Sequence, residues 1–379
     1  MPQNSATTPT LLEVLDHTPR PLAFGTSGRR GLVQDLTQLE VFINVRAELE
    51  YLLSRPRSAG GLEPGGEFFI AHDLRPSSTA FVPSQGGRGE LAQAVIAAVE
   101  DAGLRPINLG PLPTPALTAH ALARQAGSIM VTGSHIPFER NGYKTNSAQG
   151  ELMKTDEAPI AEYVARWRHS LSNAPAATSP FASDGRLKHG PKPLPKVDPA
   201  GAHAYLRRYV DFFGAEALRG LRVLVYQHSA VGRDLLVDTL RALGAEATPV
   251  GRSETFVPID TEALDDATLA ELTGLAAAAS SGDARFDALV STDGDSDRPL
   301  ILGLHYDDLG RPSARFHGGD LVGMVVAAAL GADRVVVPVS CNDAIDRGPL
   351  AALLEPKTRI GSPYVIAGML AARARGARR

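Results

Sequence analysis

Five apolar, β-branched segments of this chain each end in a polar or glycine-bearing loop and then give way to a helix-like pattern. This alternation is typical of parallel strands connected by helices, so it predicts an α/β fold. In open α/β sheets the functional side chains lie at the carboxyl ends of the strands. The loops after these strands are therefore candidate walls of one site. The five segments are FFIAHDLRPSS, SIMVTGSHIP, RVLVYQHSAVGRD, ALVSTDGDSDR and RVVVPVSCNDAID.

The chain has 379 residues, which is too long for one ordinary hydrophobic core. We expect three consecutive, similar α/β domains with mixed, largely parallel sheets. A stretch rich in Pro, Ala and Ser, without apolar periodicity, predicts a linker over residues 172–200. The predicted domains are therefore residues 1–171, residues 201–306 and a partial third domain over residues 307–379.

Composition excludes several classes of function. The formal net charge of −4 and the 21% content of charged residues provide no electrostatic surface for nucleic acid or anionic membrane. The longest apolar stretch, residues 321–332, is too short to span a bilayer, and residues 1–20 lack the pattern of a signal peptide. The one cysteine, Cys341, cannot form an internal disulfide. We expect a cytoplasmic protein that acts on small molecules, with no nucleic-acid or membrane partner.

The strongest functional pattern is the segment STDGDSDRP, in which Asp293, Asp295 and Asp297 alternate directly after an apolar run. Three carboxylates this close repel one another, and burying them costs free energy unless a cation compensates. Alternate side chains of an extended segment point the same way, so all three can converge on one ion. Oxygen ligands favour a hard cation, Mg²⁺ before Ca²⁺. An EF-hand is excluded because Arg298 stands where its glycine is required, and a solvated acidic turn is the alternative.

A glycine-rich loop, FGTSGRRG over residues 24–31, combines three glycines, two hydroxyls and two arginines. Glycines let backbone N–H groups approach a phosphate, and guanidinium groups match its oxygens. The loop follows neither the GxxxxGKS/T nor the GxGxxG pattern, so it does not imply a nucleotide. Taken alone, it predicts either an anion site or a flexible surface loop.

The loop TGSHIPFERNGYK, residues 132–144, places Ser134 and His135 side by side after an apolar run. Neighbours on an extended chain point to opposite sides, and the flanking residues do not form a GxSxG turn, which argues against a Ser–His hydrolase. A serine that carries a phosphoryl group near a divalent cation fits better, with Lys144 available for proton transfer. Phosphoryl transfer depends mainly on positioning and charge stabilisation. An ordinary turn is the alternative for this loop alone.

Together, these three loops resemble those of the α-D-phosphohexomutase family, enzymes that interconvert hexose 1-phosphates and 6-phosphates. The loop at 24–31 is similar to the family's phosphate loop, 132–144 to its phosphoserine loop, and STDGDSDRP to its magnesium loop. IAHDLRPSS and LGPLPTPAL are similar to further family segments of the first domain. Gly133 and Ile136 depart from the commonest family loop, TASHNP, which has alanine and asparagine there.

The resemblance implies catalytic roles for residues of the first domain. Ser134 would be the phosphorylated serine, and His135 and Lys144 would lie beside the reacting hydroxyl. Lys144 matches the residue proposed in the family for proton transfer. Arg30 matches a site arginine, whereas Arg29 occupies a variable position and is given no role.

The resemblance also implies a metal site and a substrate site. One Mg²⁺ ion would be shared by Asp293, Asp295, Asp297 and a phosphate oxygen on Ser134. The partners would be small sugar phosphates, with hexose 1,6-bisphosphate as intermediate or activator. The residues expected to contact substrate are Thr26, Ser27, Arg298, Gly361 and Ser362.

Three further segments, VYQHSAVGRD, FVPIDTEAL and RIGSPYVI, resemble the bacterial phosphomannomutase branch, which implies mannose as the sugar. Compared with the family pattern, the chain lacks the fourth domain, about 100 residues, which anchors the non-reacting phosphate. We therefore expect mutase activity at least about 100-fold below that of a four-domain relative. The alternatives are a weakly active or inactive fragment that binds Mg²⁺ and sugar phosphate, and a slow sugar phosphatase.

Overall fold

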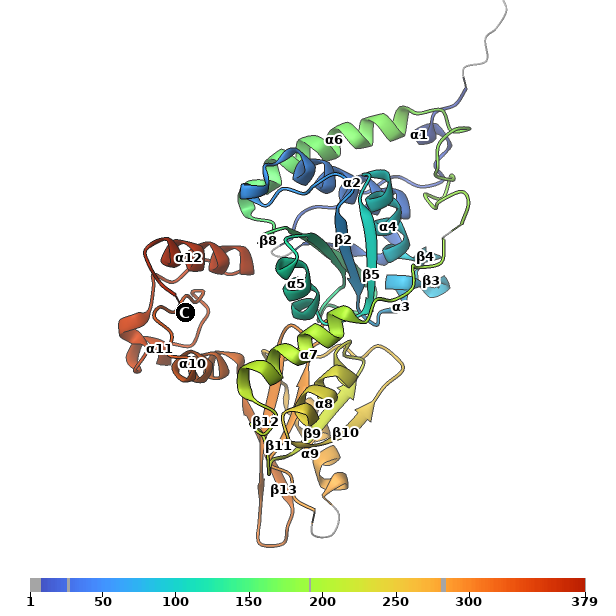
Figure 1. The fold of residues 1–379 in the computed structure, drawn as a ribbon. Helices are drawn as coiled ribbons and strands as arrows, with labels where there is room; N and C mark the ends of the chain where they lie inside the picture. Colours follow the sequence, from blue (N-terminus) through green and yellow to red (C-terminus); the bar gives the residue numbers. More distant parts are fainter. Residues whose placement is uncertain (1–7, 26–27, 191, 281–283, 379) are drawn as a thin grey trace, which may run out of the picture. The chain divides into compact units, whose positions relative to one another are not determined.

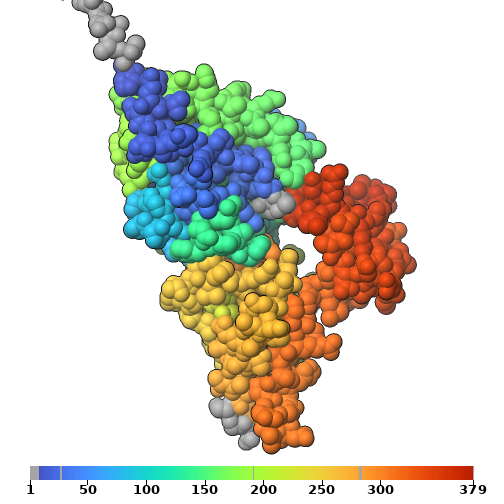
Figure 2. All heavy atoms as spheres, turned by 180° about the vertical axis from the view of Figure 1, so that it is seen from behind, coloured from blue at the N-terminus to red at the C-terminus, as the bar shows by residue number. Residues whose placement is uncertain are grey.

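The computed structural model describes residues 8–25, 28–190, 192–280 and 284–378 (Figure 1). The chain divides into two compact units, Met1–Gly201 and Ala202–Arg379, and each is described by itself below. In the colour scale shared by Figures 1 and 2, the first unit runs from blue to yellow-green and the second continues to red.

The first unit is built on a mixed six-stranded sheet. Its strands are β1 (Arg29–Leu32), β2 (Glu67–His72), β5 (Arg105–Pro111), β6 (Gly127–Val131), β7 (Arg140–Ser147) and β8 (Gly150–Glu151). They follow the order β1-β7-β6-β2-β5, with β8 paired to β7. Strand β2 runs parallel to β5 and β6, whereas β7 runs antiparallel to β6 and β1. A separate hairpin pairs β3 (Phe81–Val82) with β4 (Arg88–Gly89).

Apolar side chains from the helices of this unit form much of the core that supports the sheet. The helices are α1 (Leu11–Val14), α2 (Gln38–Ser54), α3 (Pro76–Thr79), α4 (Leu91–Asp101), α5 (Thr114–Ala123) and α6 (Glu157–Asn173). Thr37 caps α2, because its side chain accepts a hydrogen bond from the backbone N–H of Glu40. Val41, Val45 and Leu49 recur at a helical spacing along α2 and are fully buried. Helix α2 packs against α4 and α6, and α4 and α5 pack on the sheet (Figure 1).

The stretch predicted as a linker, residues 172–200, packs on the first unit. Phe181 is buried in the core of that unit, and its ring lies 5.3 Å from the ring of Phe42 on α2. Main-chain hydrogen bonds hold the segment in a turn, since the N–H of Ala182 donates to the carbonyl of Arg186. The burial of one aromatic side chain therefore fixes a segment whose composition indicates little structure.

The second unit contains a mixed five-stranded sheet in the order β10-β9-β11-β12-β13. Its strands are β9 (Arg222–His228), β10 (Glu246–Arg252), β11 (Ala288–Thr292), β12 (Pro299–Tyr306) and β13 (Pro312–His317). Strand β9 runs parallel to β10 and β11, whereas β12 runs antiparallel to β11 and β13. The helices that accompany them are α7 (Ala200–Phe213), α8 (Arg233–Ala242) and α9 (Asp266–Ala279). Strand β13 belongs to this sheet and pairs with β12. The predicted domain boundary after residue 306 therefore lies within the hairpin that β12 and β13 form.

Residues 318–378 form a smaller helical region. Its helices are α10 (Gly319–Ala329), α11 (Ala344–Arg347) and α12 (Ser362–Ala374). The segment RVVVPV, expected as a strand, contributes only isolated parallel bridges, between Val335 and Leu354 and between Pro338 and Thr358. A small cluster of buried residues, Cys341, Ile345 and Leu350, forms the core of this region.

The predicted α/β class with mixed sheets is confirmed. Four of the five predicted strands are present as β2, β6, β9 and β11, and the parallel ladders of the two main sheets join these strands to one another or to their neighbours β5 and β10. Within the part of the chain that the structure describes, no helix has both the length and the apolar character needed to cross a membrane.

Candidate active site

The first candidate element is the loop that carries Ser134, directly after strand β6. The backbone N–H of Ser134 donates to the side-chain oxygen of Thr132 at 2.7 Å, and Ser134 is buried. Ser134 adopts a left-handed conformation with φ of 52°, which is uncommon for a residue with a side chain. This turn brings its Oγ to 3.4 Å from Nδ1 of His135.

The expectation that the side chains of Ser134 and His135 point to opposite sides is therefore wrong. The two side chains approach each other because the backbone turns between them. A serine hydrolase is still not indicated, since the residues around Ser134 form no GxSxG turn.

An arginine from another segment holds the Ser134 loop in place. Arg75, which precedes α3, is 1% exposed, and its guanidinium donates to four backbone carbonyls of the loop at 2.5–2.9 Å. These carbonyls belong to Ser134, Ile136, Pro137 and Arg140. Planar guanidinium groups suit this task because they present several N–H donors in fixed directions.

A buried aspartate at the end of β2 completes this clamp. Asp73 accepts hydrogen bonds from the hydroxyl of Thr132 at 2.8 Å and from the N–H of Gly133 at 3.2 Å. It also lies 3.4 Å from Nε of Arg75, so the buried guanidinium and carboxylate compensate each other's charge. The sequence patterns did not identify Asp73 or Arg75 as supports of the site, although both lie in the family-like segment IAHDLRPSS.

The position of Arg75 accounts for the glycine at 133. A Cβ atom on Gly133 would meet Nε of Arg75 at 2.5 Å and Cζ at 2.6 Å. The alanine of the family's commonest loop therefore does not fit here unless the guanidinium moves.

Gly133→Ala is expected to lower the free energy of unfolding by about 1–3 kcal/mol, the usual range for overpacking a well-filled site. Thermal unfolding followed by circular dichroism measures the change. Gly274→Ala is the control, because no atom lies within 4 Å of the added Cβ on helix α9, and alanine there should stabilise by about 1 kcal/mol or less. A Gly133→Ala variant as stable as the unmodified chain would contradict the assignment of Arg75 to this space.

Strand β7 and the glycine-rich loop form the second element of the first unit. The N–H of Thr132 donates to the carbonyl of Gly142, which joins the Ser134 loop to the strand that carries Lys144. A Cβ on Gly28 would lie 3.0 Å from Cα and 3.1 Å from Cγ of Lys144, so Gly28 lies directly against this lysine. Arg30 pairs with Gly142 in the β1–β7 ladder. The predicted residues Thr26 and Ser27 lie outside the described residues.

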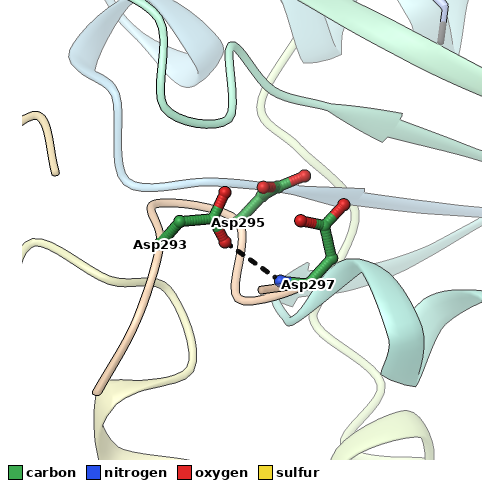
Figure 3. A group of neighbouring side chains, drawn as sticks. All are labelled: Asp293, Asp295 and Asp297. Atoms are coloured by element: carbon green, nitrogen blue, oxygen red, sulfur yellow. Dashed lines mark hydrogen bonds between the residues drawn. The ribbon is translucent and has the colours of Figure 1, made fainter. Parts of the chain in front are cut away.

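The second unit carries the acidic loop that follows β11 (Figure 3). One carboxylate oxygen from each of Asp293, Asp295 and Asp297 lies within 4.8 Å of the others. Asp293 and Asp295 are fully buried, whereas Asp297 is exposed. The Oδ1 atom of Asp293 accepts hydrogen bonds from the N–H groups of Asp297 at 3.1 Å and Arg298 at 3.2 Å. The predicted convergence of the three carboxylates is therefore present.

A serine between the aspartates anchors this loop to the neighbouring strand end. Ser296 has φ of 59°, and its Oγ accepts hydrogen bonds from the N–H of Gly232 at 2.9 Å and the hydroxyl of Thr292 at 2.8 Å. The N–H of Val231 donates to the carbonyl of Gly294. The loops after the parallel strands β9 and β11 thus meet at one sheet edge, as the strand order requires.

A buried histidine at the end of β9 supports the same strand end. Burial lowers the pKa of His228 to about 4, in spite of its hydrogen bond to the Thr292 carbonyl, and the Arg233 guanidinium acts in the same direction as burial. The ring is therefore neutral at pH 7, and its Nε2–H donates to the Thr292 carbonyl at 2.8 Å. This contact fixes Thr292, the residue before Asp293. No sequence pattern indicated this role of His228.

Arg298 contributes positive charge beside the acidic loop. Its Nε lies 3.7 Å from carboxylate oxygens of both Asp293 and Asp297, and its Nη1 lies 3.0 Å from Glu262. Burial opposes its charge, but the carboxylates, Asp293 most strongly, raise its pKa above the ordinary value. The two predicted residues farther along, Gly361 and Ser362, lie at the start of α12.

The first unit matches a known protein family. Residues 21–170 match the family described as phosphoglucomutase/phosphomannomutase, alpha/beta/alpha domain I. This range contains the glycine-rich loop at 24–31, Ser134 and Lys144.

Two curated relatives match almost the whole chain. A phosphomannomutase of Sinorhizobium fredii is 37% identical over 356 residues, which cover 94% of this chain and 66% of the relative. A phosphomannomutase of Salmonella muenchen is 35% identical over 345 residues, which cover 91% of this chain and 61% of the relative. The chain thus spans less than two thirds of the length of either relative.

Solved structures share the fold at lower sequence identity. A provisionally named phosphomannomutase of Thermus thermophilus has a TM-score of 0.67 and 20% identity, covering 94% of this chain and 73% of its own. A phosphoglucomutase/phosphomannomutase family protein of Burkholderia thailandensis has a TM-score of 0.63 and 19% identity. The match covers 93% of this chain and 69% of that protein. From the family match of residues 21–170 and the similarity to the two phosphomannomutases, this chain belongs to the phosphoglucomutase/phosphomannomutase family.

Proposed function

We propose that this chain catalyses, or contributes to, the interconversion of hexose 6-phosphate and hexose 1-phosphate, with mannose as the preferred sugar. The observation that carries the proposal is the acidic loop, whose three carboxylates lie within 4.8 Å of one another in a chain of this family. The preference for mannose is supported by the names of the two relatives, both phosphomannomutases.

The donor chemistry of the acidic loop fits Mg²⁺. All three donors are carboxylate oxygens, and two of the side chains are fully buried, so a cation would offset a repulsion that solvent cannot screen. Asp293, Asp295 and Asp297 would hold the ion, with an oxygen of a phosphate on Ser134 as a further ligand. When bound, Mg²⁺ would neutralise charge on the transferring phosphoryl group.

The residues of the first unit would perform the transfer. The bond between phosphorus and Ser134 Oγ breaks while a bond from phosphorus to a sugar hydroxyl oxygen forms, and Lys144 takes the proton of that hydroxyl and passes it to the departing Ser134 Oγ. The product is a hexose 1,6-bisphosphate. It returns its other phosphate to Ser134, which leaves the isomeric monophosphate. His135 would lie beside the reacting oxygen, and Arg30 would stabilise the phosphoryl charge.

The remaining predicted residues would bind the substrate. The guanidinium of Arg298 suits a phosphate because it presents paired N–H donors. Backbone and hydroxyl groups of the two predicted loops would hold the sugar phosphate in both of its orientations. These substrate-binding residues are Thr26, Ser27, Arg298, Gly361 and Ser362.

A coupled assay tests this proposal. Mannose 1-phosphate and glucose 1-phosphate are supplied separately with Mg²⁺ and a trace of hexose 1,6-bisphosphate, and formation of the 6-phosphate is followed. We expect faster conversion of mannose 1-phosphate, and no conversion by Ser134→Ala. Equal rates for the two sugars would overturn the mannose preference. Release of inorganic phosphate without isomer would identify a phosphatase instead.

A further inference from the structure

A carboxylate on α2 is buried beneath strand β7 and bonds three different donors. The side chain of Glu48 is 1% exposed. Its oxygens accept hydrogen bonds from Nε of Arg29 at 2.6 Å, from the hydroxyl of Tyr143 at 3.4 Å and from the hydroxyl of Thr145 at 2.6 Å. Buried charges are stable only when paired and fully hydrogen-bonded, so this arrangement is strongly constrained.

Two of these donors flank Lys144 on β7. Side chains alternate along a strand, so Tyr143 and Thr145 face α2 while Lys144 faces the opposite side of the sheet. Gly28 of the glycine-rich loop lies against this lysine, since a Cβ on Gly28 would be 3.1 Å from Cγ of Lys144. The bonds to Glu48 therefore fix the backbone on both sides of the lysine.

The third donor links Glu48 to the glycine-rich loop itself. Arg29 also donates from Nη1 to the carbonyl of Leu22 at 2.6 Å, and its guanidinium stacks 3.8 Å from the centre of the Phe24 ring. Burial opposes the charge of Arg29, but the Glu48 carboxylate raises the pKa of Arg29 above its ordinary value. Burial and Glu48 likewise raise the pKa of Tyr143, which therefore remains a donor.

We propose that Glu48 is a positioning residue, which holds Lys144 against the glycine-rich loop by binding both neighbours of the lysine and the arginine that anchors the loop. It touches no reacting atom itself. The use of Lys144 in catalysis rests on the proposed function, but its placement by Glu48 does not. Arg29, which the family pattern leaves without a role, gains one here.

Thr145→Val tests the placement without leaving a buried charge unpaired. The variant keeps the volume of the side chain and the Arg29–Glu48 pair, and it removes one hydrogen bond next to Lys144. Acetylation by a limiting amount of acetic anhydride, read by mass spectrometry of peptides, measures the exposure of individual lysines. We expect the rate at Lys144 to rise about fivefold, the factor that one lost hydrogen bond typically gives. The rate at Lys192, which pairs with Glu100 on α4, should stay unchanged.

Matched variants distinguish the loss of the hydrogen bond to Glu48 from a general loosening of strand β7. Ser147→Ala removes a hydroxyl on the same strand and face, but that hydroxyl bonds the Gly150 carbonyl and not Glu48. It should leave the Lys144 rate as it is, and Thr145→Ser should restore it. If Thr145→Val fails to fold, Tyr143→Phe removes another donor to Glu48. Unchanged acetylation in both variants, or an equal rise in Ser147→Ala, would overturn the proposal.

A second measurement distinguishes failure of the positioning proposal from failure of the proposed function. Transfer of phosphate from hexose 1,6-bisphosphate to Ser134 should be slower in Thr145→Val than in the unmodified chain. If the unmodified chain takes up no phosphate, the proposed function fails, and the acetylation rates still decide whether Glu48 positions Lys144. If phosphate uptake is normal in all variants and acetylation is unchanged, only the positioning role fails.

Discussion

Replacing Arg75 with alanine is expected to lower the free energy of unfolding of the first unit by about 3–5 kcal/mol, the usual cost of removing one partner of a buried ion pair. Asp73, which is 2% exposed, would lose its guanidinium partner. Four backbone carbonyls of the Ser134 loop would also lose their donor. The only tryptophan of the chain, Trp167 on α6, packs near Phe42 in the same unit, so its fluorescence during urea unfolding reports the change.

Two control variants isolate the cause of this loss. Arg75→Lys retains the charge but cannot reach four carbonyls with one ammonium group, so it should recover only part of the stability. Arg105→Ala removes an exposed ion pair with Glu67 and should cost about 1 kcal/mol or less. An Arg75→Ala variant within about 1 kcal/mol of the unmodified chain would show that the guanidinium does not support the loop.

Mg²⁺ is expected to stabilise the second unit, by about 2.7 kcal/mol at 100 times its dissociation constant. Asp297→Asn should reduce the affinity at least about tenfold, equivalent to about 1.4 kcal/mol, because one of three carboxylates loses its charge. Without metal, the same variant should be at least as stable as the unmodified chain, since two buried carboxylates remain beside it. Isothermal titration and thermal unfolding, with and without Mg²⁺, measure both effects.

Asp308→Asn is the matched control for this experiment. Asp308 is exposed in the turn between β12 and β13, so its replacement should leave the Mg²⁺ affinity unchanged. No heat and no thermal shift on adding Mg²⁺ to the unmodified chain would identify the three aspartates as a solvated acidic turn. Equal affinity of Asp297→Asn and the unmodified chain would exclude Asp297 as a ligand.

The features that could be predicted from sequence are those encoded within short segments. An apolar run followed by a polar loop marks the end of β11, and the alternation of Asp293, Asp295 and Asp297 predicts their convergence. The order in which the serine loop and the acidic loop follow one another can be read directly from the sequence. Local patterns therefore identified the α/β class, the acidic loop and the serine loop.

The supports of the site could not be predicted because they depend on contacts between distant segments. Arg75 bonds carbonyls 59 to 65 positions away, and Glu48 bonds Thr145 across 97 positions. Glu48 is also one of three acidic residues of α2, with Glu40 and Glu50, and an acidic residue in a helix ordinarily indicates an exposed position. The turn at Ser134 is likewise set by Thr132, Asp73 and Arg75, which a short sequence window does not combine.

The central claim is that Ser134 accepts and donates a phosphoryl group. The most direct measurement is the mass of the peptide that contains Ser134 after the full chain is incubated with hexose 1,6-bisphosphate and Mg²⁺. The account predicts one added phosphate on Ser134, retained in Ser147→Ala, abolished in Ser134→Ala, and lost again when sugar monophosphate is added. Phosphate on a different residue, still present in Ser134→Ala, would contradict it.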